Sequence, residues 1–247
     1  MAEAKIRLFV EHPLGPGQPV PISPDQAHYL FGVMRLAVGG AVLLFNGRHG
    51  EWRAEVAEAG KRGGILICAV QTRPLVLPCD LWLMFAPIKK ARTDFIVEKA
   101  VELGVARIMP VQTQHTHADR IRQDKLQAHA MEAAEQCGAT VVPEVAELAG
   151  LERVLAGWDD TRRILWCDEG MAGGKAHLPT GRRGQPWAIL IGPEGGFSDR
   201  EQGRLRGMAC VVPIPLGPRI LRADTAAVAA LTLWQAALGD WVGGDWL

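Results

Sequence analysis

The sequence has few cysteines, and none of them is placed to pair or to bind zinc. Five cysteines are scattered over 247 residues, and no two form a Cys-x-x-Cys pair. An odd number at wide spacing argues against a disulfide framework and against a zinc cluster, so we expect small buried side chains. His115 and His117 have no third ligand nearby, and no metal is expected.

Net charge and long apolar runs are also missing. Lys and Arg together number 27, as do Asp and Glu, so no global field attracts nucleic acid or an anionic membrane, and such a partner would need a local patch. The longest apolar stretches, such as residues 81–88, are far shorter than the roughly 20 residues of a membrane span. The first residues show no signal-peptide pattern. A cytoplasmic protein without membrane contact is expected.

Residues 1–73 read as a small β-domain. Short β-like runs separated by Gly, Pro and Asn-Gly turns are typical of a barrel or sandwich. The expected strands are residues 6–10, 41–45, 52–56 and 65–70. Only residues 25–36 have a helical pattern. Two prolines between residues 73 and 78 predict a linker.

Residues 78–247 read as an α/β domain. Apolar strands are expected at residues 81–86, 107–111, 164–167, 187–191 and 210–214. They alternate with helices expected at residues 93–103, 125–137, 148–155, from 198 onward, and 224–238. Such alternation predicts a largely parallel sheet covered on both faces.

Two loops that follow strands stand out. Ligands of open parallel sheets lie beyond the carboxyl ends of the strands. The loop GPEGGF (192–197) carries three glycines that let backbone approach a ligand, and Ser198 begins a capping-box sequence for the next helix. The loop PLGPRILR (215–222) holds Arg219 and Arg222, which suit a phosphate or carboxylate. Neither loop is a dinucleotide fingerprint or a P-loop.

Several segments together resemble one family. IGPEGGFSDRE (191–201), LGPRILRADTA (216–226), DFIVEKAVELGV (94–105) and EAAEQCG (132–138) resemble the RsmE family of bacterial 16S rRNA uracil-N3 methyltransferases. RLFVE (7–11), HYLFGVMRLAVGG (28–40) and LLFNGRHGEWRAEV (43–56) resemble it as well. The chain departs from the family pattern at Ala91-Arg92, at Gln114–His117 and at Ala223-Asp224.

The resemblance implies a fold and a cofactor. It implies a SPOUT methyltransferase domain at residues 78–247, with a deep trefoil knot, after a PUA-like RNA-binding barrel at residues 1–73. It also implies a homodimer that binds S-adenosylmethionine through backbone groups of three loops. By position the cofactor-binding residues are Leu165, Cys167, Ile191, Gly192, Pro193, Gly195, Gly196, Leu216, Gly217, Ile220 and Leu221.

Methylation of uracil N3 needs an electrostatic group and a proton acceptor. The uridine must be unpaired or flipped, because N3 lies on the Watson–Crick edge. Arg222 is favoured for stabilising negative charge on the uracil oxygens, with Arg219 close in sequence. The carboxylates near these loops are Glu194 and Asp224, and the residue that accepts the proton is not assigned from the sequence. An equal alternative for Glu194 is that it closes its own loop by accepting backbone N–H bonds.

Seven cationic residues are candidates for RNA contact. Four lie in the β-domain and three in a dense cluster after the first strand of the α/β domain: Arg7, Arg35, Arg48, Arg53, Lys89, Lys90 and Arg92. Phosphate contacts there would give a salt-dependent affinity.

The family resemblance predicts methylation of 16S rRNA in the small ribosomal subunit. Two alternatives stay open at this point. One is a SPOUT methyltransferase for another RNA position, such as a ribose 2′-OH. The other is a non-catalytic RNA-binding or ribosome-assembly protein, which would have no reason to keep a cofactor pocket.

Overall fold

The computed structural model describes residues 4–117, 120–174 and 179–241. The chain forms two compact units. The N-terminal unit comprises Met1–Leu77 and Ala134–Val142, and the C-terminal unit comprises Pro78–Ala133 and Pro143–Leu247. The expected limits of 1–73 and 78–247 stay a prediction. Among the described residues, no helix is long and apolar enough to cross a membrane.

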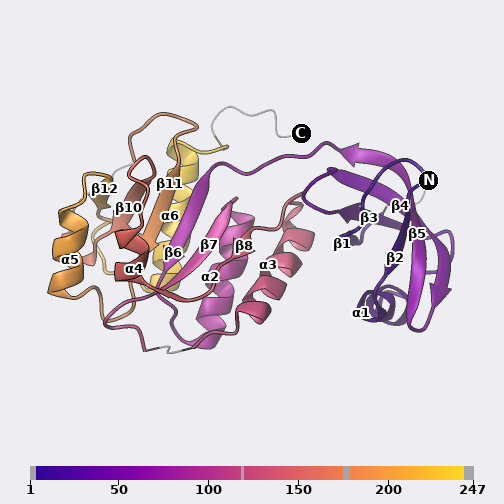
Figure 1. The fold of residues 1–247 in the computed structure, drawn as a ribbon, viewed down its shortest axis with the longest axis horizontal. Helices are drawn as coiled ribbons and strands as arrows, with labels where there is room; N and C mark the ends of the chain where they lie inside the picture. Colours follow the sequence, from indigo (N-terminus) through magenta and orange to yellow (C-terminus); the bar gives the residue numbers. More distant parts are fainter. Residues whose placement is uncertain (1–3, 118–119, 175–178, 242–247) are drawn as a thin grey trace. The chain divides into compact units, whose positions relative to one another are not determined.

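The N-terminal unit is built on one five-stranded sheet (Figure 1). Its strands are β1 (Arg7–Phe9), β2 (Pro19–Ile22), β3 (Ala41–Phe45), β4 (Glu51–Gly60) and β5 (Gly63–Arg73). The order is β1-β3-β4-β5-β2, with β1 and β3 parallel and the other pairs antiparallel. Alternate residues such as Val42, Leu44 and Leu66 are fully buried and form the core of this sheet. The strand β2 was not expected, because its two prolines weaken a strand pattern.

The helical pattern expected at residues 25–36 is confirmed over residues 25–33, where two kinds of helix follow each other. A short α1 (Pro24–Ala27), capped by Ser23, runs directly into a π-helical segment, η1 (His28–Val33). Arg35 follows with φ of 54°, the left-handed region that few non-glycine residues adopt. Gly32 and the exposed Val33 weaken an ordinary helix at this point, which a periodicity of apolar residues does not reveal.

A buried carboxylate joins two arginines in the N-terminal unit. Glu51 on β4 is 2% exposed and accepts hydrogen bonds from Arg7 Nε at 2.7 Å and from Arg73 Nη2 at 2.5 Å. Thr72 Oγ1 donates to the same carboxylate at 2.8 Å. Burial would raise the pKa of Glu51, but the hydrogen bonds from Arg73, Arg7 and Thr72 outweigh it and lower the pKa. Arg7 also donates to the carbonyl of Ala134 at 2.6 Å.

The C-terminal unit contains a parallel sheet in the order β12-β10-β11-β6-β7-β8, and β9 pairs with β7. Its strands are β6 (Leu81–Phe85), β7 (Arg107–Gln112), β8 (Glu144–Val145), β9 (Ala149–Gly150), β10 (Arg163–Cys167), β11 (Trp187–Ile191) and β12 (Val211–Ile214). All pairs are parallel. The two-residue strands β8 and β9 were not expected, since runs so short carry no periodicity.

Helices pack against this sheet. They are α2 (Lys90–Glu102), α3 (Gln123–Cys137), α4 (Leu151–Ala156), η2 (Glu169–Met171), α5 (Asp199–Arg206) and α6 (Ala223–Ala237). The predicted capping box at Ser198 and Glu201 is confirmed. One core cluster joins Met84, Trp166 and Leu190 of the sheet to Leu155 of α4 and Leu205 of α5. The helices α2 and α6 contact each other. In Figure 1, α4 and α5 lie away from that pair.

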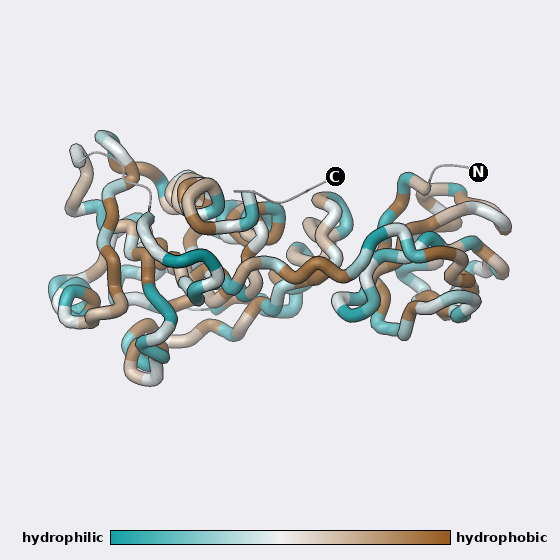
Figure 2. The backbone as a smooth tube through the Cα atoms, turned by 90° about the horizontal axis from the view of Figure 1, so that it is seen from above, coloured by the Kyte–Doolittle hydropathy of each residue, from teal (hydrophilic) through white to brown (hydrophobic). Residues whose placement is uncertain are grey.

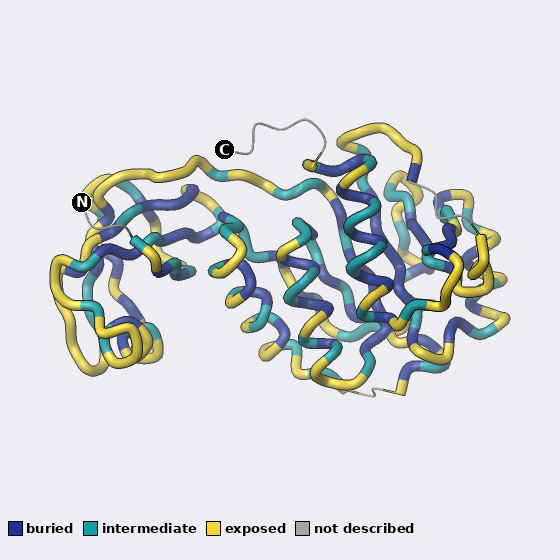
Figure 3. Tube along the Cα trace, turned by 180° about the vertical axis from the view of Figure 1, so that it is seen from behind, coloured by how far each residue is buried: buried dark blue, intermediate teal, exposed yellow. Residues whose placement is uncertain are grey.

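Burial follows hydropathy in both units. Hydrophobic stretches are brown in Figure 2. Among the strands, all five residues of β11 are buried. The helices in Figure 3 show buried residues on one side and exposed residues on the other. The predicted α/β class is therefore confirmed, and the sheet brings the loops after β6, β10, β11 and β12 to one edge. The trefoil knot stays a prediction.

Candidate active site

A cavity of about 450 Å³ lies at the carboxyl edge of the parallel sheet. Its lining comes from the segments that follow four adjacent strands: Lys89 and Arg92 after β6; Cys167, Asp168, Glu169 and Ala172 from β10 onward; Ile191, Gly192, Pro193, Glu194 and Phe197 from β11 onward; Leu216, Gly217, Arg219, Ile220, Leu221, Arg222, Ala223 and Ala226 after β12. Its volume is in the range of small-molecule sites.

The loop after β11 requires glycine at two positions. A Cβ atom at Gly192 would lie 2.7 Å from Cε2 of Phe197, whose ring packs edge-on against Trp166. Gly196 has φ of 66°, and a Cβ atom there would overlap the Glu169 carboxylate. At Gly192 and Gly196 the backbone of the loop therefore lies directly against neighbouring side chains, which leaves no room for a side chain at either position.

The loop after β12 brings two exposed arginines to the cavity. Gly217 has φ of 114°, a conformation that side chains disfavour, and the chain turns there before Arg219. Arg222 occupies the N-cap position of α6 and makes no capping hydrogen bond with its side chain. Within the described parts of the chain, neither Arg219 nor Arg222 has an ion-pair partner, so both guanidinium groups are available to an anion.

The loop after β10 supplies two carboxylates. Asp168 is 7% exposed and accepts a hydrogen bond from the backbone N–H of Gly170 at 2.9 Å. Glu169 follows on η2, and burial together with neighbouring Asp168 raises the pKa of its carboxyl, while His115 acts in the opposite direction. The carboxylate oxygens of Asp168 and Glu169 are acceptors for hydrogen bonds from hydroxyl or amino groups of a ligand.

The segment after β7 supports the glycine loop from outside. His115 Nδ1 lies 2.9 Å from the carbonyl oxygen of Gly195 and 3.2 Å from that of Gly196. Because carbonyl oxygens only accept, Nδ1 carries the hydrogen. The backbone N–H of Gln114 donates to Glu201 Oε1 at 2.9 Å. These bonds tie the segment to the glycine loop, and they give His115 a structural partner in place of a metal.

Eight of the predicted cofactor residues line the cavity: Cys167, Ile191, Gly192, Pro193, Leu216, Gly217, Ile220 and Leu221. Three do not. Leu165 is fully buried within β10, and the Gly195 and Gly196 carbonyls face His115. Asp168 and Glu169 also line the cavity. They lie within the loop 165–169 that the family resemblance implies, although neither was chosen as an individual cofactor contact.

The predicted catalytic residues Glu194, Arg219 and Arg222 all line the cavity. Arg92 lies with them, at 3.5 Å from Glu194 by the closest ion-pair atoms. In the described part of the chain no hydrogen bond to a backbone N–H engages the Glu194 carboxylate, so the structure offers no support for the loop-closing alternative.

The seven predicted RNA-contact residues differ in availability. Arg7 is bound to Glu51 and to carbonyl oxygens, and Arg53 pairs with Glu55 at 2.7 Å, with its own side chain 15% exposed. Both cations therefore already have partners within the protein, and their contact with RNA stays a prediction. Arg35, Arg48, Lys89 and Lys90 are exposed, although Arg48 donates to the Glu11 carbonyl and Lys90 pairs with Asp94.

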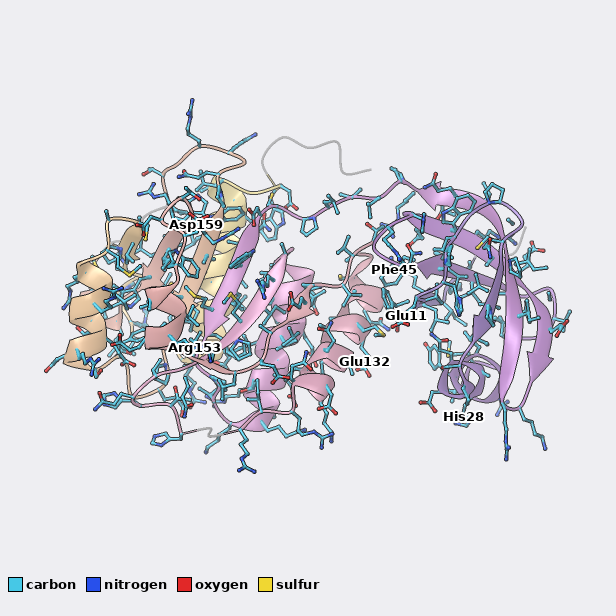
Figure 4. The ribbon with its side chains drawn as sticks, viewed as in Figure 1. Glu11, His28, Phe45, Glu132, Arg153 and Asp159 are labelled. Carbon is cyan, nitrogen blue, oxygen red and sulfur yellow. The ribbon has the colours of Figure 1, made fainter. Side chains whose placement is uncertain are left out.

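A second cavity, of about 570 Å³, is lined by residues of β6 and β7, by α4 and by the segments that flank α4. Trp82, Trp158, Arg153, Asp159 and Arg162 are among its lining residues, and Figure 4 labels Arg153 and Asp159. Arg162 is stacked 3.6 Å from the Trp82 ring centre and pairs with Asp80, so its charge is already engaged. The cavity at the carboxyl edge, where ligands of parallel sheets bind, is therefore the candidate active site.

Cys167 is expected to be chemically inert despite lining the cavity. Burial raises the pKa of its thiol to about 12, and a thiol rather than a thiolate is a poor nucleophile. Alkylation with iodoacetamide at pH 8, followed by peptide mass spectrometry, should label the exposed Cys137 first and leave Cys167 unlabelled. Labelling of Cys167 as fast as Cys137 would contradict the raised pKa of the Cys167 thiol.

Comparisons with known proteins point to one family. A family profile described as an RNA methyltransferase domain matches residues 76–235, and an RNA methyltransferase PUA domain profile matches residues 22–67. The ribosomal RNA small subunit methyltransferase E of Synechocystis sp. is 30% identical over 227 residues, which cover 89% of this chain and 73% of that protein.

Solved structures agree with the profiles. A methyltransferase of Legionella pneumophila in complex with the cofactor SAM is 29% identical with a TM-score of 0.87, covering 97% of this chain and all of that one. The small subunit methyltransferase E of Neisseria gonorrhoeae bound to S-adenosylmethionine is 25% identical with a TM-score of 0.83, covering 96% and 99% of the two chains.

Fold and cavity thus define a class: an RNA methyltransferase domain joined to a PUA domain. Within that class the chain belongs to the ribosomal RNA small subunit methyltransferase E family. The resemblance found from the sequence motifs is confirmed.

Proposed function

We propose that the protein transfers a methyl group from S-adenosylmethionine to N3 of a uridine in 16S rRNA of the small ribosomal subunit. The observation that carries this proposal is the cavity at the carboxyl edge of the sheet, where three loops of the family motifs meet exposed arginines. Relatives of this chain are named for methylation of small-subunit ribosomal RNA, and two similar structures hold the cofactor.

The residues present fit this cofactor. Gly192 and Gly217 expose backbone to the cavity, and Ile191, Ile220 and Leu221 supply apolar surface for a flat base. The carboxylates of Asp168 and Glu169 accept hydrogen bonds from ribose hydroxyls or an amino group. When bound, the cofactor supplies an electrophilic methyl group.

The remaining chemistry belongs to side chains at the cavity. The N3 proton must leave, and its departure places negative charge on N3 and the uracil oxygens. That charge is neutralised as N3 takes the methyl group, whose bond to the sulfur of the donor breaks. Arg222 stabilises that charge, with Arg219 beside it. Glu194 is the candidate acceptor of the proton, since its carboxylate lies at the same cavity and is 47% exposed.

Replacement of Arg222 by alanine is expected to lower kcat for methyl transfer by about a hundred-fold, because a preorganised electrostatic partner of this kind contributes a factor of that size. The affinity for S-adenosylmethionine, measured by calorimetry, should stay within about twofold. Wild-type kcat in the Arg222→Ala variant, with normal RNA binding, would remove Arg222 from this role.

The substrate is a large anion, and the proposed contacts are exposed cations. Lys89, which lines the cavity, and Lys90 lie at the start of α2. Arg35 and Arg48 are exposed on the N-terminal unit, which is proposed to bind RNA as its PUA profile implies. A homodimer and a cytoplasmic location belong to the same proposal.

The test is transfer of a tritiated methyl group to purified ribosomal subunits that lack native modification. Label should enter the RNA of the small subunit and not that of the large subunit. Cofactor binding without label in either RNA would keep the fold and contradict the proposed substrate, and absence of both would favour a non-catalytic RNA-binding protein.

A further inference from the structure

Arg92 lies between two carboxylates that come from different loops of the cavity. It belongs to the first turn of α2, after β6. Its Nη1 lies 3.5 Å from Glu194 Oε1 in the loop after β11, and its Nε lies 3.6 Å from Asp224 Oδ2 at the start of α6. One guanidinium group therefore links three segments of the active site.

Arg92 lies where a cation does not stabilise α2. The start of α2 carries Lys89, Lys90 and Arg92, and its first turn has no acidic residue. Cations at a helix N-terminus oppose the helix dipole. Lys90 is compensated by Asp94 on its own helix, at 3.3 Å, whereas Arg92 is compensated by carboxylates of the cavity. The position of Arg92 is therefore explained by its contacts with carboxylates of the cavity and not by the stability of its own helix.

The two carboxylates differ in how firmly they are held. Asp224 Oδ1 accepts a hydrogen bond from the backbone N–H of Thr225 at 2.8 Å, and the Asp224 side chain is 19% exposed. Glu194 is 47% exposed, and within the described segments Arg92 is the partner of its carboxylate. Asp224 can thus fix the guanidinium group, and the guanidinium group can fix Glu194.

We propose that Arg92 is a positioning residue for methyl transfer: anchored by Asp224, it holds the Glu194 carboxylate at the cavity where the uracil N3 proton must leave. This inference rests on the proposed function. It also differs from the expectation that Arg92 is a phosphate contact, because both partners of its guanidinium group are acidic side chains of the protein itself.

The geometry of the Arg92 guanidinium group distinguishes a positioning residue from a phosphate contact. Arginine reaches Glu194 and Asp224 through two different nitrogens of a planar group, and the compact ammonium group of lysine does not reproduce that fork. A phosphate contact tolerates lysine, which binds phosphate as a point charge. Substitution by lysine therefore distinguishes positioning from phosphate binding.

The first experiment compares Arg92→Lys and Arg92→Ala with the wild-type protein on small ribosomal subunits. Both variants are expected to lose about a hundred-fold in kcat, the size of effect that a misplaced group produces. Their RNA Kd and its salt dependence should stay near wild type, as should the cofactor Kd. Lys90→Ala serves as the comparator for a phosphate contact and should weaken RNA binding and give a shallower salt slope.

Two results would overturn the proposal. One is near-wild-type kcat in Arg92→Lys. The other is a loss in Arg92→Ala confined to RNA affinity, with the salt slope reduced by about one. A double-mutant cycle adds a direct measure: the kcat losses of Arg92→Ala and Glu194→Gln should be strongly non-additive, and independent losses would contradict the link.

A readout without turnover separates this inference from the proposed function. In 15N spectra of the wild-type protein, the Arg92 Nε–H should exchange with water more slowly than that of Arg204, an exposed arginine of α5 that has no ion-pair partner among the described residues. Asp224→Asn should accelerate the Arg92 exchange, because the anionic partner 3.6 Å from Nε is lost. Equal exchange of Arg92 and Arg204 would overturn the positioning role of Arg92 even if methyl transfer is observed, and absence of methyl transfer with a protected Arg92 would count against the proposed function alone.

Discussion

Alanine at position 192 is expected to weaken binding of S-adenosylmethionine by about ten- to a hundred-fold. The added Cβ would lie 2.7 Å from Cε2 of Phe197, which is 7% exposed and packed against Trp166. Relief of that overlap moves Phe197 or the loop, and both line the cavity. Overpacking of this kind costs about 1–3 kcal/mol, and about 1.4 kcal/mol corresponds to a tenfold change in Kd.

Titration calorimetry of the Gly192→Ala variant with S-adenosylmethionine measures this effect. Gly203→Ala is the matched control, because Gly203 lies in α5 with no atom within 4 Å of a Cβ at that position. The control should bind the cofactor normally and gain slightly in stability, since alanine favours a helix over glycine. Equal cofactor affinity in Gly192→Ala and the wild type would show that the loop does not form the cofactor site.

Removal of the Glu51 carboxylate is expected to destabilise the N-terminal unit by about 3–5 kcal/mol, the usual cost of breaking a buried ion pair. Glu51→Ala leaves Arg7, whose side chain is 11% exposed, without its carboxylate partner. Hydrogen exchange followed by mass spectrometry should show lost protection in β4 and β5 of the N-terminal unit and unchanged protection in β10 and β11.

Two controls make the Glu51 result specific. Glu55→Ala removes the acidic partner of Arg53. Because the Glu55 side chain is 49% exposed, this substitution should change the free energy of unfolding by less than about 1 kcal/mol. The pH dependence gives the second control. Because the pKa of Glu51 is lowered from 4.5, its stabilisation is present above that value and is lost as the pH falls through the folded-state pKa. Glu51→Ala should lack this part of the acid sensitivity, and an unchanged acid profile would contradict the account.

The sequence predicted the C-terminal unit better than the N-terminal unit, for physical reasons. Strands of a covered parallel sheet are continuous apolar runs, such as residues 187–191, and glycines and capping residues mark where the helices begin and end. The π-helical segment at His28–Val33 has no such signal. Its apolar spacing resembles that of an ordinary helix, and the exposure of Val33 is decided by tertiary packing.

The loops that line the cavity could be predicted because they follow the apolar strands that also predict the sheet. Their glycines and arginines follow strands directly, and parallel strands bring such loops to one edge. The partners of individual charges could not be predicted. Arg7 bonds to Glu51, 44 residues away, and Arg92 lies near Asp224, so both depend on contacts between distant segments that no local pattern encodes.

The central claim is the identity of the methylated atom. Small ribosomal subunits without native modification should be incubated with the protein and S-adenosylmethionine carrying a tritiated methyl group, and the RNA digested to nucleosides and separated by chromatography. The account predicts that the label elutes as N3-methyluridine. Label in a ribose-methylated nucleoside, or in any base other than uracil, would contradict it.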